Sequence, residues 1–225
     1  VHIAHATTRL AVEAARAAGM SVGITPHHLL LNRDVGTDAR FKVNPPLRAD
    51  PARRSLAEAF AEGLVSHLES DHAPHTPAEK LKQGIWECQC GMLGVETAMS
   101  LMLTEVSRGR LTLSNYVRLS AVNPAKLWRL YPRKGTIRVG SNADIVIVDL
   151  DRAGTIDQEK LHSKSRISSW HGREVRGQPV CTLVRGKVVV RDGALRAEPG
   201  WGQYVVQTPP QPAPRNIGVG AAPPA

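Results

Sequence analysis

The chain has 225 residues, of which 42% are hydrophobic and 22% charged, and this length suffices for one large domain or two small ones with a buried core. Such a composition, with only three cysteines, excludes collagen-like, wholly disordered and disulfide-stapled proteins. The formal charge of +9 is uneven, because residues 1–100 carry 10 Lys and Arg against 11 Asp and Glu, whereas residues 101–225 carry 19 against 9.

The basic excess of residues 101–225 does not predict a nucleic-acid partner. Its charges are spread singly and aromatic residues make up only 4% of the chain, whereas nucleic-acid grooves combine basic stripes with stacking rings. We expect a solvated basic face or a docking surface for an acidic partner instead. The chain also lacks an apolar run of the roughly 18 residues that a membrane span needs, and a basic-then-apolar leader. With so few cysteines, these features predict a cytoplasmic protein without a membrane partner.

Residues 1 to about 132 alternate short apolar runs with helical patterns. Gly19 and Gly63 are typical of the residue that follows a helix, and Pro51 of a first helical turn. Each apolar run ends in polar residues, which is the βα pattern of a parallel sheet or barrel. We expect strands over residues 1–5, 20–25 and 64–70, and helices over residues 6–18, 51–62, 94–106 and 113–119.

The period of the hydrophobic pattern changes in the second half of the chain. Residues 143–149 form a β-branched run, and residues 180–190 predict two strands around a tight turn at Arg185 and Gly186. The last part is rich in proline, glycine and alanine and has little to bury. The chain is therefore expected to be α/β in three parts: a partial barrel over residues 1–132, a small β-sandwich-type domain over residues 133–199 and a disordered tail over residues 200–225.

Seven of the nine histidines lie at or before position 75, and they gather at the predicted strand ends. Histidine is the commonest side-chain ligand for zinc, and barrels place catalytic groups at the carboxyl ends of their strands. If the three strands lie side by side, His5 and Asp71 form an imidazole and carboxylate pair suited to zinc or manganese. The alternative is structural, with each histidine capping a strand or bonding to the backbone.

The segment over residues 41–48, FKVNPPLR, is the second informative stretch. Its two prolines restrict the backbone around Asn44. An amide on a rigid loop can offer both a donor and an acceptor to a cyclic imide or ureide. Arg48 either binds a carboxylate or ties down the loop, and we favour the second role. The spacing of Cys88 and Cys90 is wrong for a zinc knuckle or a CxxC redox motif, so we expect no metal there.

Taken together, these motifs resemble the dihydroorotases, which belong to the cyclic amidohydrolases with the allantoinases and hydantoinases. The resemblance covers about residues 1–205, and the DHAPH motif at residues 71–75 favours dihydroorotase over allantoinase. Residues 135–146 look like the start of the superfamily's C-terminal β domain. The motifs, in the family's order, are HIAHATT at 2–8, TPHHL at 25–29, KVNPPLR at 42–48, SDHAPHT at 70–76, GVET at 94–97 and NPA at 123–125.

The resemblance implies a TIM-type (β/α)₈ barrel that holds one or two zinc ions at its mouth. His5 matches the metal ligand that ends the sixth strand, and Asp71 matches the aspartate of the eighth strand, which binds metal and shuttles the proton. Asn44 and His75 match groups that hold the ring and the carboxylate of the substrate. The implied reaction converts dihydroorotate and water reversibly into N-carbamoyl-aspartate. The alternative within this class is an allantoinase or a hydantoinase-like hydrolase of cyclic ureides.

Several parts of the family pattern have no counterpart here. The metal-binding residues of the first, fourth and fifth strands are missing, since Val1 would stand at the start of the sixth. Gly23 stands where an acidic residue is common before Thr-Pro-His-His, and Gln89-Cys90-Gly91 replaces Pro-Phe-Gly. We therefore expect a C-terminal portion of the enzyme, about strands six to eight, with the remaining zinc ligands upstream of Val1.

Catalytic zinc normally takes three protein ligands and a water, so this portion alone is expected to be inactive. A hypothesis of another class is a non-catalytic, dihydroorotase-like scaffold subunit that binds a partner. A homo-oligomer stays open in either case.

Overall fold

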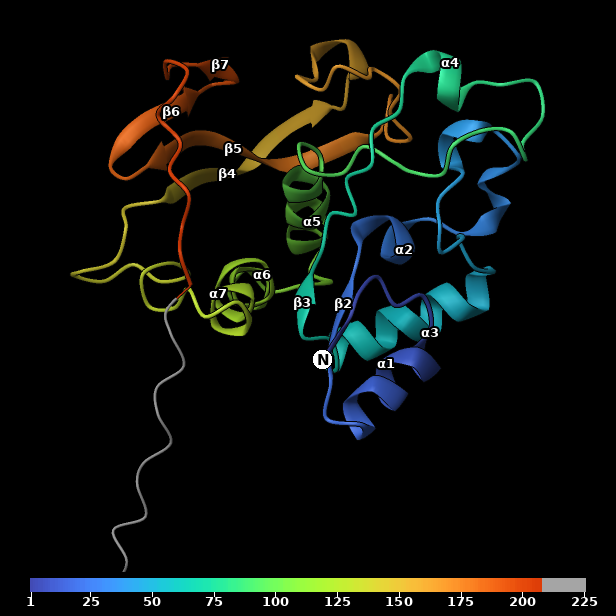
Figure 1. Cartoon of the computed structure of the whole chain (residues 1–225), viewed down its shortest axis with the longest axis horizontal. Coiled ribbons are helices and arrows are strands. Elements are labelled where there is room, and N and C mark those ends of the chain that lie inside the picture. The colour runs from blue at the N-terminus through green and yellow to red at the C-terminus, as the bar shows by residue number, and fades with distance from the viewer. Residues whose placement is uncertain (208–225) are drawn as a thin grey trace, which may run out of the picture.

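The computed structural model describes residues 1–207, which form two sheets joined through a layer of helices (Figure 1). A three-stranded parallel sheet has the order β1-β2-β3, and a four-stranded antiparallel sheet has the order β4-β5-β6-β7. Within residues 1–207, we find no helix with the length and apolarity of a membrane span. The strands are β1 (His2–Ile3), β2 (Ser21–Ile24), β3 (His67–Leu68), β4 (Ile145–Thr155), β5 (Glu174–Val184), β6 (Lys187–Arg191) and β7 (Ala194–Leu195).

The helices between and after the parallel strands follow the expected order. Helix α1 begins after Thr8, whose side chain accepts from the backbone N–H of Ala11, and the predicted end at Gly19 has a positive φ of 68°. The predicted helix at 113–119 is the start of a longer one, which continues through a π-helical turn over Arg118–Val122. The helices are α1 (Arg9–Ala17), α2 (Pro26–Leu30), α3 (Asp50–Ala61), α4 (Pro77–Lys80), α5 (Ala98–Ser107), α6 (Leu113–Val117) and α7 (Asn123–Leu127).

The parallel sheet confirms the three strands expected from the first half of the sequence. His2 pairs with Ser21, and Gly23 pairs with His67, so β2 lies between β1 and β3. Side chains alternate along a strand, and Val22 and Ile24 are fully buried in the core on the helix side of β2. Residue 23 therefore faces the opposite side of the sheet, where the polar strand-end residues lie.

Helix α2 is an element that the sequence pattern did not predict. Thr25 ends β2 and caps the helix by accepting from the backbone N–H of His28, and Pro26 occupies the first helical turn. The expected strand and turn at this place were correct, but the helix that follows has only five residues and shows no hydrophobic period. Its position directly after β2 buries His27 and His28.

The antiparallel sheet contains the predicted turn at Arg185 and Gly186. Both residues have positive φ, 49° and 80°, as expected of the two-residue hairpin between β5 and β6. Strand β5 begins at Glu174, earlier than the predicted position 180. Gly177 and Pro179 hide this first half in the sequence, because both residues usually interrupt strands; here the pairing with β4 shifts register in the same region.

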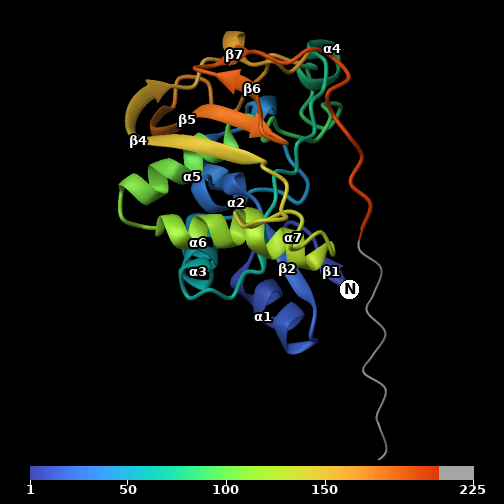
Figure 2. The same cartoon turned by 90° about the vertical axis from the view of Figure 1, so that its left-hand side faces the viewer.

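Helix α5 connects the two sheets (Figures 1 and 2). Leu103 belongs to the core beneath the parallel sheet, whereas Leu101 packs in a second core with Trp170 and Val175. The backbone N–H of Arg176 in β5 donates to Thr104 Oγ1 at 2.9 Å. The antiparallel sheet is therefore held against the same helix layer that covers the parallel sheet.

The last described residues contact the antiparallel sheet. The Trp201 indole N–H donates to the carbonyl of Val184, and Arg185 and Lys187 lie over its ring at 4.5 and 4.7 Å from the centroid. The predicted disordered tail began at residue 200; its part from residue 208 onward lies outside the described residues.

Candidate metal and substrate site

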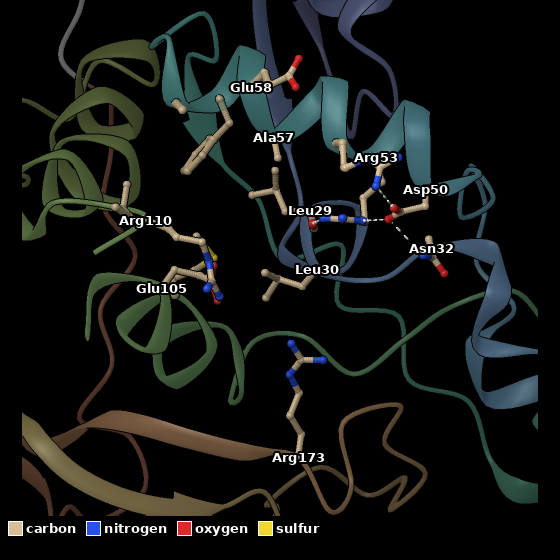
Figure 3. A pocket seen from close by; sticks show the side chains of 15 residues that line it. Leu29, Leu30, Asn32, Asp50, Arg53, Ala57, Glu58, Glu105, Arg110 and Arg173 are labelled. Atoms are coloured by element: carbon tan, nitrogen blue, oxygen red, sulfur yellow. Dashed lines mark hydrogen bonds and ion pairs between the residues drawn. The ribbon is translucent and has the colours of Figure 1, made fainter. Parts of the chain in front are cut away.

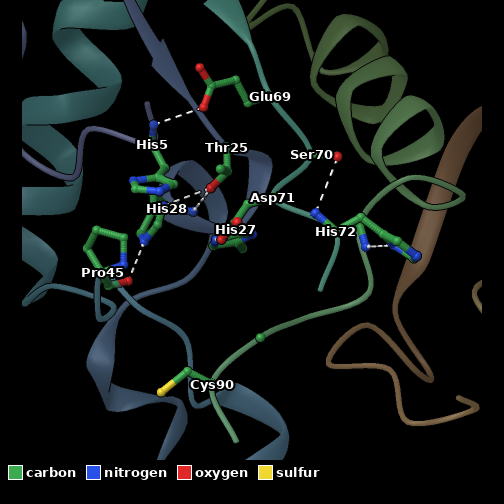
Figure 4. Close-up of polar contacts among 12 residues, drawn as sticks. His5, Thr25, His27, His28, Pro45, Glu69, Ser70, Asp71, His72 and Cys90 are labelled. Carbon is green, nitrogen blue, oxygen red and sulfur yellow. Dashed lines mark hydrogen bonds and ion pairs between the residues drawn. The ribbon is translucent and has the colours of Figure 1, made fainter. Parts of the chain in front are cut away.

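His5 and Asp71 lie at the carboxyl edge of the parallel sheet, just beyond β1 and β3 (Figure 4). Both have left-handed backbones, with φ of 40° and 44°, which costs a non-glycine residue energy and is concentrated at functional sites. The charge of His5 acts on the pKa of Asp71, so the two side chains share one environment. The edge therefore brings together the two residues that the sequence assigned to the metal, although their roles stay predictions.

His27 is the buried neighbour of this pair. Its Nε2 lies 3.9 Å from Asp71 Oδ2. This Nε2 and the Nδ1 of His5 are both inaccessible to solvent, and neither has a hydrogen-bond partner within residues 1–207. Burial lowers the pKa of His27 to about 3, with a further contribution from His28, so its ring is neutral at pH 7. The sequence pattern placed His27 in the histidine cluster but gave it no role.

His28 connects the end of β2 with the loop that carries Asn44. Its Nε2 lies 2.9 Å from the carbonyl of Pro45 and its Nδ1 lies 2.8 Å from Thr25 Oγ1. A carbonyl only accepts, so Nε2 donates, and the Nδ1 of the neutral ring accepts from the threonine hydroxyl. Burial lowers the pKa of His28 to about 4. The structural alternative weighed for each histidine therefore applies to this one.

The two predicted substrate-binding residues lie on neighbouring loops. Asn44 is exposed and precedes Pro45, which His28 holds. The His75 ring donates through Nε2 to the carbonyl of Cys90 at 2.9 Å. The backbone N–H of Gly91 donates to the carbonyl of Lys42 at 2.9 Å, so the chain beside His75 is joined to the chain that leads to Asn44. Neither residue is shown to contact a substrate, and both roles stay predictions.

Loop attachments account for Arg48 and for a lysine that the sequence analysis missed. Arg48 donates to Thr7 Oγ1 at 2.9 Å, which is the loop-tying role that we favoured. Lys80 is buried, and its ammonium donates to the carbonyls of Lys42, Gln89 and Gly91. Desolvation lowers its pKa, and three carbonyl acceptors use all three of its protons.

Glu69 is the largest omission from the sequence analysis. Its Oε1 lies 2.6 Å from His2 Nε2 and 3.1 Å from His67 Nε2, and its Oε2 accepts from the backbone N–H of His5 at 2.9 Å. Partial burial alone would raise the pKa of Glu69, but hydrogen bonds from His67, the His5 backbone and His2 hold it down to about 2. Alternation along the predicted third strand could have revealed it, since residues 67 and 69 fall on one face.

The pKa of Asp71 is shifted in the opposite direction to that of Glu69. Partial burial raises its pKa, the charge of His5 opposes that rise, and the charge of Glu69 adds to it. Within the described residues it accepts no hydrogen bond of ordinary length, and His27 Nε2 at 3.9 Å is too distant for one. The carboxylate is thus held without a strong partner of its own.

The donors at this edge fit part of a zinc site. His5 Nδ1 and His27 Nε2 are buried nitrogens without partners among the described residues, and burial of such groups is costly unless something binds them. Imidazole nitrogen together with a carboxylate oxygen is a donor set that zinc prefers. The set is incomplete, because zinc in hydrolases normally uses three protein ligands.

A hollow outside the histidine cluster lies between α2, α3 and α5 (Figure 3). Its volume is about 700 Å³. Arg53 pairs there with Asp50 at 2.7 Å, and Arg110 pairs with Glu105 at 2.5 Å. Neither the clustered histidines nor Asp71 line it, so this hollow is separate from the candidate site.

Comparison with known proteins decides the family. Residues 1–189 match the model of the amidohydrolase family. The chain belongs to the amidohydrolase family. A dihydroorotase of Halobacterium salinarum is 44% identical over 193 residues, which are 84% of this chain and 44% of that protein. An L-hydantoinase of Paenarthrobacter aurescens is 41% identical over 171 residues, 74% of this chain and 37% of that protein.

Solved structures give the same family. L-hydantoinase (dihydropyrimidinase) from Arthrobacter aurescens superposes with a TM-score of 0.87 and 35% identity, over 92% of this chain and 48% of that one. D-hydantoinase (dihydropyrimidinase) from Thermus sp. has a TM-score of 0.84 and 34% identity, over 90% and 47%. This amidohydrolase chain thus spans about half the length of the relatives that it matches.

The stability of this amidohydrolase chain should fall as the pH falls from 6.5 to 4.5. His27 and His28 have folded pKa values of about 3 and about 4, below the ordinary histidine value of 6.5. In this window the unfolded chain therefore binds protons that the folded chain does not. Each histidine should cost up to about 1.4 kcal/mol per pH unit in the free energy of unfolding.

Urea unfolding in chelator-containing buffer at several pH values measures this slope. His27→Gln should remove its share of the dependence, and His27→Gln with His28→Gln should remove most of it. The window stops at pH 4.5 because Glu69, whose folded pKa is about 2, adds its own loss of stability below the ordinary glutamate pKa of 4.5. A wild-type stability that stays constant from pH 6.5 to 4.5 would contradict the burial of neutral rings.

Proposed function

We propose that this chain is the C-terminal portion of a metal-dependent hydrolase of cyclic amides, similar to dihydroorotase. Residues 1–132 would contribute about strands six to eight of a TIM-type (β/α)₈ barrel, and residues 133–199 a small β domain. The observation that carries the proposal is that His5 and Asp71 lie at one sheet edge beside His27, whose buried Nε2 has no hydrogen-bond partner within residues 1–207. The similarity to dihydroorotases and hydantoinases supports the same class.

In this proposal, His5 and Asp71 hold one or two zinc ions together with ligands outside these 225 residues. When bound, zinc supplies a hydroxide at neutral pH and polarises the amide carbonyl. The Asp71 carboxylate accepts the proton of the attacking water at an Oδ atom and delivers it to the leaving ring nitrogen.

The remaining residues would bind and orient the substrate. The Asn44 side chain offers a donor and an acceptor to the ring. His75 binds the carboxylate of dihydroorotate through its Nε2–H, which leaves the carbonyl of Cys90 to do so. His28 keeps Asn44 in place through the carbonyl of Pro45. Buried His27 excludes water from behind Asp71. The reaction interconverts dihydroorotate and water with N-carbamoyl-aspartate.

Two other functions remain as alternatives to this proposal. Hydantoinase-like turnover of cyclic ureides is favoured by the hydantoinases among the structural relatives, and allantoinase belongs to the same group. A non-catalytic scaffold is favoured by the basic second half of the chain, which suits an acidic partner. The enzyme proposal includes a cytoplasmic location and a small-molecule substrate, and leaves a homo-oligomer open.

Substrate turnover by the complete natural polypeptide that contains these 225 residues tests the proposal. With zinc present, dihydroorotate is expected to be hydrolysed faster than hydantoin or allantoin. The 225-residue chain alone is expected to turn over none of them and to retain no zinc through dialysis. If hydantoin or allantoin is turned over faster, that compound replaces dihydroorotate as the assigned substrate. If the zinc-loaded complete protein turns over none of the three, the result favours the non-catalytic scaffold.

A further inference from the structure

The Glu69 carboxylate occupies the place of a missing side chain on β2. A Cβ atom built on Gly23 would overlap the carboxyl group of Glu69. Gly23 does not have the left-handed backbone that requires glycine, and it lies inside a regular strand. The absence of a side chain at position 23 is therefore explained by space for Glu69 and not by backbone conformation.

This space lets Glu69 reach across a strand. β2 lies between β1 and β3, so a side chain that follows β3 can contact β1 only by passing over β2. Glu69 passes over Gly23 and contacts His2 in β1 as well as the backbone of His5 beyond it. One carboxylate thus connects the two strand ends that carry His5 and Asp71.

The contact with His5 acts on a strained part of the backbone. His5 has φ of 40°, and its N–H donates to Glu69 Oε2 at 2.9 Å. The next N–H, of Ala6, donates to the carbonyl of Gly23 at 2.9 Å. These two bonds fix the peptides on both sides of the His5 Cα and hence the direction of its Cα–Cβ bond. A hydrogen bond to a charged acceptor is among the stronger ones in proteins.

We propose that Glu69 is a positioning residue, which holds His5 in its left-handed conformation across Gly23 and so sets the ring for metal binding. The part of this proposal that concerns metal rests on the proposed function. The part that concerns the His5 backbone does not, because it depends only on the bond between Glu69 Oε2 and the His5 N–H.

A separate metal site at His2, His67 and Glu69 is the competing explanation, since their ligand atoms lie within 4.8 Å of one another. The hydrogen bonds favour a polar network instead. The Nε2 of His2 hydrogen-bonds to Oε1 at 2.6 Å and, because a carboxylate only accepts, carries the proton and has no lone pair for a metal. The Nε2 of His67 lies 3.1 Å from the same oxygen, and its buried Nδ1 has no hydrogen-bond partner within residues 1–207, so His67 is the residue that distinguishes the two explanations. The Nδ1 of His2 lies 2.9 Å from Ser21 Oγ, which completes its bonding.

Hydrogen exchange of the His5 amide in the ¹⁵N-labelled 225-residue chain tests the backbone part. Glu69→Ala should lower the protection of this amide by about tenfold or more. Glu69→Gln keeps the volume and one acceptor oxygen, so it should retain part of the protection and covers the case in which the alanine variant fails to fold. Unchanged protection in the glutamine and alanine variants would overturn the proposal.

Moving the carboxylate to the neighbouring strand tests the geometry. Gly23→Asp should reduce protection while Glu69 is present, because the two side chains compete for one space. Gly23→Asp combined with Glu69→Ala should recover it, because an aspartate at position 23 delivers a carboxylate to the same place. A general structural role of Glu69 would not give this rescue. Failure of the double variant to exceed Glu69→Ala would count against the proposal.

Zinc affinity of the complete polypeptide, measured by competition with a chromogenic chelator, tests the metal part. Glu69→Ala should weaken it by about tenfold or more, and the double variant should recover it. Glu62→Ala is the control, because that carboxylate pairs with Arg9 on an exposed helix face and should change neither readout. Loss of one equivalent of tightly bound zinc in His67→Ala, with normal His5 protection, would favour the competing metal site and overturn the proposal.

The outcomes separate this inference from the proposed function. If His5 protection and zinc affinity respond to Glu69 while no cyclic amide is hydrolysed, the positioning role stands and the substrate assignment falls. If amide hydrolysis is found but zinc affinity is the same with and without Glu69, the function stands and the positioning role falls.

Discussion

Asp71→Asn in the complete zinc-loaded polypeptide should lower kcat for dihydroorotate by about a thousandfold or more. In the proposed function, Asp71 both binds the metal and transfers the proton. General acid–base catalysis alone contributes about 10²–10⁴-fold to a reaction rate. Asparagine keeps the shape and tolerates the left-handed φ of 44° at this position, but it cannot accept the proton. Steady-state rates at saturating substrate measure the effect.

The same substitution should leave the fold intact. Burial raises the pKa of Asp71, so the folded protein disfavours the charged carboxylate. Among the described residues, this carboxylate also accepts no hydrogen bond of ordinary length that the substitution would remove. Thermal unfolding of Asp71→Asn in metal-free buffer is therefore expected to match or slightly exceed the wild type. Asp151→Ala is the control, because its carboxylate is exposed and, within residues 1–207, forms an ion pair with Arg176 alone. A fully active Asp71→Asn enzyme would remove the mechanism.

Gly177→Ala should destabilise the chain by about 2–4 kcal/mol. Gly177 has φ of 91°, which costs an L-residue roughly 1–2 kcal/mol. A Cβ there would also lie 2.7 Å from Leu103 Cβ on helix α5, and overpacking a core costs about 1–3 kcal/mol. Urea unfolding at pH 7 measures the loss.

Gly193→Ala separates the two contributions to this loss. Its φ is 76°, but nothing lies within 4 Å of the added Cβ, so only the conformational cost of roughly 1–2 kcal/mol should appear. The difference between the two variants then reports how tightly β5 lies against α5. Equal losses would mean that the antiparallel sheet is not closely packed on the helix layer.

Local patterns were sufficient for most elements of the fold. Thr8 and Gly19 mark the ends of α1 in the sequence, and Arg185-Gly186 marks the hairpin, because capping and turn formation depend on neighbours within a few residues. The first half of β5 was missed, since Gly177 reads as a strand break in the sequence, and its close approach to Leu103 involves a residue far away along the chain. Helix α2 was missed because five residues are too few for a hydrophobic period.

The candidate site divides in the same way. His5 and Asp71 were recognisable as strand-end residues, because parallel strands bring their carboxyl ends to one edge. His27 was visible as part of a cluster, but its neutral state follows from burial, which composition does not reveal. Glu69 was missed altogether, because its role depends on a space left by Gly23 on the next strand.

Residue types and their spacing along the chain therefore determined the βα order, the family motifs and the residues offered to a metal. Only the tertiary structure decided which of those residues share an environment, which rings lose their charge and which glycine makes room for a carboxylate. The physical reason is that caps, turns and periodicity arise from contacts between near neighbours in sequence. Desolvation and contacts across strands arise from residues that meet only when the sheet has formed.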